Sequence, residues 1–86
     1  MFNNSIRVDH NYLKVFLHLK DTPSDSWSNI ECNWEILPGK GDLLTLSTTG
    51  SPYKVIAVLY PIFQESEYDV EVYAVKIDLD QELSLS

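Results

Sequence analysis

Three side chains in this 86-residue chain have the types needed for nucleophilic or zinc chemistry: His10, His18 and Cys32. A thiol beside an imidazole can form a nucleophile and base, and cysteine with histidine can bind zinc. A structural zinc site needs about four ligands, and only scattered carboxylates could complete this set. Cys32 alternates with Ile30 and Trp34, which predicts an inward-facing thiol that acts as a small apolar group. We therefore expect no catalytic residue, no metal and no cofactor.

Two other patterns resemble functional motifs but lack essential residues. Asp78, Asp80 and Glu82 alternate like the first ligands of a calcium loop, yet Leu83 stands where such a loop needs its turn glycine. No serine lies in a Gly-x-Ser-x-Gly sequence, and the three glycines form no phosphate-binding loop. The sequence predicts a protein that is not an enzyme.

Acidic side chains are concentrated in the last third of the chain. The whole chain has thirteen acidic and six basic residues, a net charge of −7, and beyond Pro61 there are seven acids against the single base Lys76. Asp69 and Glu71 share the outward face of a predicted strand with Tyr73. The candidate partner-binding residues are Glu65, Glu67, Asp69, Glu71 and Tyr73.

This charge distribution favours a basic protein partner and disfavours direct nucleic-acid binding, because an acidic surface repels phosphate. We expect a non-enzymatic protein-binding module, present as a monomer or weak homodimer, that docks a basic partner through its last strand. An alternative is an inhibitor or immunity-type protein whose carboxylates mimic nucleic-acid phosphates. A third interpretation is that the acids only keep a small domain soluble and its sheet edge unpaired.

Alternation of apolar and polar side chains predicts five strands. They cover residues 12–20, 30–36, 43–48, 53–60 and 68–79. The fourth is apolar on both faces, which is typical of a central strand. In the fifth, the inward parity changes near residues 73 and 74, which predicts a β-bulge there.

The five strands are joined by short connections with no helix long enough for a crossover. Thr22 and Pro23 predict at most one helical turn before the second strand. We therefore expect an all-β, five-stranded antiparallel meander that forms a small SH3-like or OB-like barrel. An open sheet covered by the segment around Trp27 is the alternative. Cys32 and Trp34 are expected in the core, and His18 at an exposed or rim position.

The composition predicts a single small β domain over residues 1–86, with an N-terminal arm at 1–11 and a frayed tail at 81–86. Cys32 is the only cysteine, so no disulfide can form within the chain, which points to a reducing compartment. The N-terminus does not resemble a signal peptide, and the longest apolar run is about half a membrane span. We expect a cytoplasmic protein that does not bind membranes.

The order of turn and strand motifs from Trp34 to Ile77 resembles a known pattern. Leu37-Pro38-Gly39-Lys40-Gly41-Asp42 forms a turn, and Tyr53-Lys54-Val55-Ile56-Ala57-Val58 forms the strand that follows later. This combination resembles small uncharacterised all-β proteins of bacteria and phages. The resemblance covers roughly half of the chain, implies the fold, and assigns no functional residue.

Overall fold

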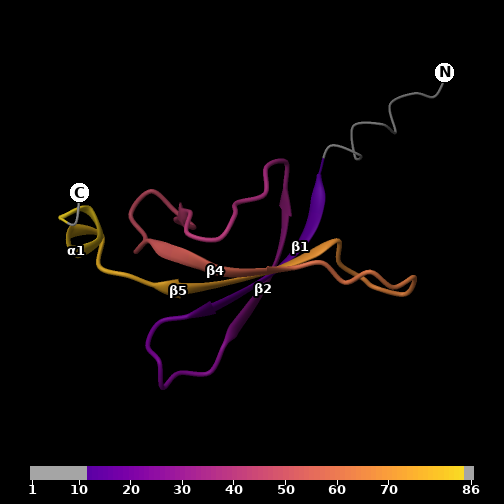
Figure 1. Ribbon diagram of the computed structural model, residues 1–86, viewed down its shortest axis with the longest axis horizontal. Coiled ribbons are helices and arrows are strands. Elements are labelled where there is room, and N and C mark those ends of the chain that lie inside the picture. Colours follow the sequence, from indigo (N-terminus) through magenta and orange to yellow (C-terminus); the bar gives the residue numbers. More distant parts are fainter. Residues whose placement is uncertain (1–11, 85–86) are drawn as a thin grey trace.

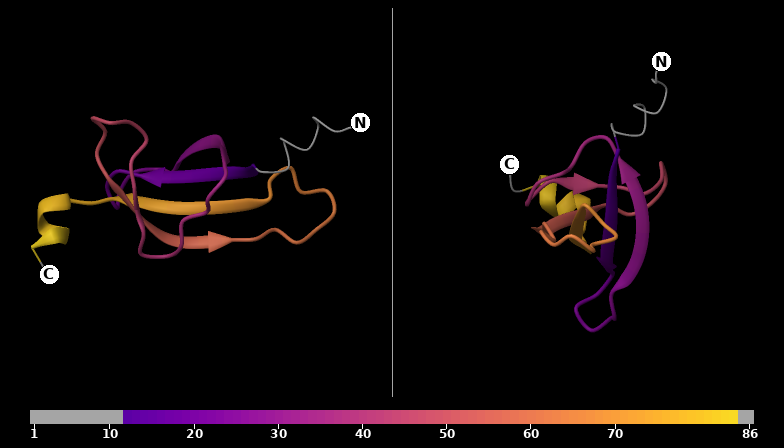
Figure 2. Two further views of the ribbon diagram at one scale, coloured as in Figure 1. Left: turned by 90° about the horizontal axis from the view of Figure 1, so that it is seen from above. Right: turned by 90° about the vertical axis from the view of Figure 1, so that its right-hand side faces the viewer.

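The computed structural model describes residues 12–84, and these form one curled five-stranded sheet followed by a short helix (Figure 1). The elements are β1 (Leu13–Lys20), β2 (Ser28–Trp34), β3 (Leu43–Leu44), β4 (Tyr53–Leu59), β5 (Val70–Lys76) and α1 (Leu79–Leu83). Neighbouring strands follow the order β2-β1-β5-β4-β3, and the sheet curls into a half-barrel (Figure 2). The predicted all-β, barrel-like fold is confirmed. The predicted N-terminal arm lies outside the described residues.

The two central strands, β1 and β5, are parallel. Val15 lies opposite Val70, and Leu19 lies opposite Ala74. The other three strand pairs are antiparallel. The prediction of a purely antiparallel meander is therefore wrong at this pair. No crossover helix is needed, because the chain between β1 and β5 forms the other three strands, so the connection passes through the sheet's own elements.

The core lies on the inner face of the curled sheet. Leu17 of β1 and Val72 of β5 are completely buried, because each central strand has a neighbour on both sides. Leu37 and Leu44, which follow β2 along the chain, pack against this face from the inside. The fully buried apolar residues are Val15, Leu17, Leu19, Val55, Val70, Val72 and Ala74.

Two local predictions need correction. β3 has two residues rather than six, because the chain leaves the sheet after Leu44. β5 ends at Lys76, and residues 79–83, predicted to continue the strand and then fray, form α1. The Asp78 carboxylate starts this helix by accepting the Asp80 N–H at 3.0 Å, an N-cap contact that satisfies an otherwise unpaired donor. The segment after Thr22 is a turn, closed by the Asp25 N–H donating to the Thr22 carbonyl at 3.0 Å.

The β-bulge lies in β4 and not in β5. The register between these strands shifts between Val55 and Ala57, so Ile56 is the extra residue. Val72 and Ala74 are both buried, which shows that β5 keeps a single inward parity. The strand predicted to bend is therefore regular, and its partner carries the irregularity.

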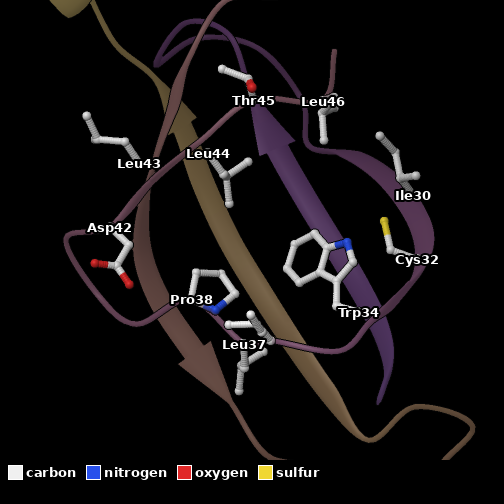
Figure 3. A pocket seen from close by; sticks show the side chains of 11 residues that line it. Ile30, Cys32, Trp34, Leu37, Pro38, Asp42, Leu43, Leu44, Thr45 and Leu46 are labelled. Atoms are coloured by element: carbon white, nitrogen blue, oxygen red, sulfur yellow. The ribbon is translucent and has the colours of Figure 1, made fainter. Parts of the chain in front are cut away.

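The half-barrel is open between its two edge strands, β2 and β3. An apolar groove of about 850 Å³ runs along this opening (Figure 3). Cys32 and Trp34 face the groove and are only half-buried, while Ile36 is 82% exposed. Cys32 and Trp34 were predicted to be largely buried in the core; both pack against it but stay partly exposed on the groove side, because β2 is an edge strand.

Replacing Leu17 by alanine should lower the free energy of unfolding by about 2–5 kcal/mol, because it leaves a cavity in a fully packed site. Ile36→Ala should change it by about 0.5 kcal/mol or less, since surface changes have small effects. Urea denaturation followed by circular dichroism measures both. Equal losses in the two variants would contradict this position of the core.

Partial burial raises the pKa of the Cys32 thiol. Because the thiolate is the reactive form, alkylation by iodoacetamide should increase with pH around a midpoint above the value of about 8.5 for free cysteine. The same protein unfolded in urea provides the reference. A native midpoint at or below the unfolded one would contradict the half-buried position of the thiol.

Candidate functional site: an aromatic face with carboxylates

The outer face of the sheet, opposite the core, gathers rings and carboxylates from three adjacent strands. Successive side chains of a strand point to opposite faces, so Phe16 and His18 point outward between the inward Val15, Leu17 and Leu19. Phe16 lies between Glu31 of β2 and Glu71 of β5 in the strand register. In the next row, His18 pairs with Asn29 on one side and Tyr73 on the other.

Five rings form a continuous series on this face, which we call the aromatic row. Tyr68 stacks on Phe16 with 4.4 Å between ring centroids and an angle of 6° between planes. Phe16 meets His18 edge to face at 4.5 Å, and His18 stacks on Tyr73 at 4.3 Å. Trp27 closes the row edge-on to Tyr73 at 5.4 Å. Such pairs contribute about 0.5–1.5 kcal/mol each beyond their burial.

The aromatic row already contacts one cation. The ammonium group of Lys20 lies 4.8 Å from the centre of the Trp27 ring. At this distance the negative face of the indole attracts a positive charge. The row is therefore a surface on which a cationic group can rest.

His18 connects the aromatic row to a carboxylate. Its Nε2 lies 2.9 Å from Glu71 Oε1, and its Nδ1 lies 2.7 Å from Asn29 Oδ1. The ring is held by one contact from each neighbouring strand. His18 is only 7% exposed, so its predicted rim position is wrong. The physical reason is that β1 is central and that the rings of Phe16 and Tyr73 cover the imidazole.

The two tyrosines of the row donate to carboxylates. The Tyr73 hydroxyl donates to Glu71 Oε1 at 3.3 Å, and partial burial together with the Glu71 charge raises the pKa of Tyr73. Partial burial, with a hydrogen bond to Glu31 and the nearby charge of Glu67, raises the pKa of Tyr68. Both hydroxyls therefore stay protonated at neutral pH and remain donors.

The candidate residues predicted from the sequence occupy three different settings. Glu71 and Tyr73 lie together on the outer face, as predicted. Asp69 has a structural task, since its carboxylate accepts the Lys14 N–H at 2.8 Å and its own N–H donates to the Lys14 carbonyl. Glu65 and Glu67 are exposed in the loop before β5. The predicted stripe is therefore not a series of equivalent free carboxylates.

Sequence reasoning missed the part of the site that comes from other strands: Phe16, Trp27, Glu31 and Tyr68. One available signal is that Phe16 and His18 occupy the polar-facing positions of β1, where Lys14 and Lys20 also lie. Aromatic side chains that point away from the core do not contribute to it, so their presence on the outer face indicates another role. Their connection to β5 depends on the β1–β5 pairing, which local periodicity does not specify.

The outer face combines rings with carboxylates, and both kinds of group attract cations. Within residues 12–84, no three histidine, cysteine, aspartate or glutamate side chains are grouped to hold a metal ion. In the same part of the chain, no helix has the length and apolar character needed to cross a membrane.

In comparisons with known proteins, no family model, no curated protein and no solved structure matched this chain. The functional argument therefore depends on the geometry of the outer face.

His18→Phe should lower the free energy of unfolding by about 1–3 kcal/mol, because phenylalanine keeps the ring contacts but removes the contact to Asn29 and leaves Glu71 with the Tyr73 hydroxyl alone. Urea denaturation of this variant, of Glu71→Gln and of the double variant measures the coupling between the two residues. Unchanged stability of His18→Phe would contradict the connecting role of the imidazole.

Proposed function

We propose that this chain is a non-enzymatic protein-binding module that binds a basic segment of another protein on its outer face. The observation that carries this proposal is the aromatic row lying among the carboxylates of Glu31, Glu67 and Glu71. The ammonium of Lys20 over Trp27 shows the kind of contact that such a partner would extend.

Arginine is the side chain that fits this face best. Its planar guanidinium stacks on aromatic rings and donates paired hydrogen bonds to carboxylates. Glu31 and Glu67 are exposed, so a partner can reach both carboxylates, and Glu31 has a second oxygen besides the one that accepts from Tyr68. The net charge of −7 would attract a basic segment from a distance and speed its encounter.

The alternative of phosphate mimicry has less support. An inhibitor that imitates nucleic acid needs a series of carboxylates free to contact an enzyme's basic groups. Here Asp69 and Glu71 already have partners within the chain, and rings separate the acids. This mixture of rings and acids suits a basic peptide better than it imitates a phosphate backbone.

As part of this proposal we place the binding in the cytoplasm. A lone cysteine with no possible partner within the chain suits a reducing compartment. Cys32 plays no part in the outer face, because it points to the groove on the other side of β2.

An arginine-rich peptide should bind the protein, and a glutamate-rich peptide of equal length should not. Glu31→Lys should weaken the arginine peptide about tenfold at low salt and flatten the salt dependence, because it reverses a charge beside the row. Asp80→Lys makes the same charge change on α1 and should alter the affinity by about twofold or less. Fluorescence anisotropy at several salt concentrations measures these effects.

A second matched pair tests the rings. Tyr68→Leu removes the first ring of the row, whereas Tyr60→Leu removes an exposed ring that no described aromatic contact includes. Only Tyr68→Leu should speed the dissociation of the arginine peptide, because an aromatic anchor mainly controls the off-rate. Equal effects within both matched pairs would show that only the net charge matters, and the proposed function would then be wrong.

A further inference from the structure

The free edge of β2 borders the apolar groove. β2 is paired with β1 on one side and, among residues 12–84, has no strand on the other. Across the groove lies β3, the opposite end of the sheet. The walls are formed by Ile30, Cys32 and Trp34 on the β2 side and by Leu43 and Leu44 on the other, and Leu46 lies at the end nearest Ile30 (Figure 3).

This edge has little of the protection that sheet edges usually have. Proline, charged side chains or a covering loop normally hinder pairing with another chain, and β2 contains no proline and a single charged residue, Glu31. Ile30 is 37% exposed and Leu43 is 41% exposed, so apolar surface is open on both walls. An unpaired strand beside an open apolar groove has the features of a site for an added strand.

We propose that the basic partner adds a β-strand to the free edge of β2. Alternate side chains of that strand are apolar and enter the groove, and the side chains between them are lysine or arginine and lie on the outer face. This inference rests on the proposed function for the charge of the partner. Beyond that function, the inference states that the bound segment is a β-strand and that the groove beside β2 fixes its register.

The strand register explains why both kinds of side chain are needed. Residues of an added strand that face inward lie beside Ile30, Cys32 and Trp34, where the groove is apolar. Residues that face outward lie beside Glu31, which is next to Phe16 of the aromatic row. Opposite charges at neighbouring positions of adjacent strands attract each other. The apolar groove and the Glu31 carboxylate therefore favour an added strand in which apolar and basic side chains alternate.

Charge also argues against a second copy of the chain as the occupant. Each copy carries a net charge of −7, so two copies repel each other. Within the chain, residues 6–8 read Ile-Arg-Val and have the same alternation. The experiment below distinguishes this segment from a separate partner.

The probes are three peptides of seven residues, the length of β2. The first alternates lysine with valine. The second has the same composition, with its valines grouped together. The third is the first peptide with N-methyl groups on alternate backbone amides, which removes strand hydrogen bonds and keeps the charge. We expect the first to bind about tenfold more tightly than the other two, since only it can pair with an edge and fill the groove.

Two readouts locate the binding to β2. Bound peptide should slow the alkylation of Cys32 and the hydrogen exchange of β2 amides, because it covers the groove and the free edge. Ile36→Gln should weaken the alternating peptide, whereas Ile62→Gln should not, although Ile62 is 92% exposed. Both substitutions replace an exposed isoleucine by a neutral side chain, and circular dichroism checks that each variant is folded.

The outcomes separate this inference from the proposed function. If all three peptides bind equally and Glu31→Lys weakens each of them, the outer face binds basic peptides and the added strand is wrong. If neither these peptides nor the arginine-rich peptide binds, both proposals fail. If the double substitution Ile6→Gln and Val8→Gln increases the affinity for the alternating peptide, the chain's own residues 6–8 occupy the groove. If the wild-type protein is a dimer that Ile36→Gln dissociates, a second copy of the chain occupies it. Either result overturns the inference.

Discussion

The parallel pairing of β1 with β5 is the constraint on which the rest of the structure depends. On the inner face it brings Leu17 against Val72 to form the core, and on the outer face it brings His18 against Tyr73. Because side chains alternate along a strand, one register determines both faces. A slip of one residue would move the rings inward and the valines outward. The core therefore fixes the geometry of the candidate site.

Local periodicity determined much of the fold but not the neighbours of each strand. The alternation in β1 and in the first half of β5 correctly predicted which residues point inward, since a period of two follows from strand geometry, whereas the predicted change of parity after Val72 was wrong. Trp34 shows the limit, because its inward direction was predicted correctly but its exposure on the groove side was not. Burial depends on whether a strand lies at the centre or the edge of the sheet, and that order is set by contacts between distant parts of the chain.

The same limit applies to the candidate site. Glu71 and Tyr73 belong to one strand, so the sequence could place them on a common face. His18 and Glu31 come from other strands, and their positions beside Glu71 and Phe16 depend on the sheet order. Asp69 was misjudged for a similar reason, because the Lys14 N–H that it accepts is 55 residues away. Charge patterns along a sequence do not show which carboxylates already have a partner.

That separation along the chain has a consequence for how the protein folds. β4 and β5 can form a hairpin from nearby residues, and β1 and β2 can form another. Joining the two hairpins pairs β1 with β5, whose contacting residues Lys14 and Asp69 are 55 positions apart, and ordering the chain between β2 and β4 costs conformational entropy. We therefore expect the docking of one hairpin on the other to be slower than the formation of either hairpin. The two faces of the central sheet form together at that step, and neither exists in a hairpin alone.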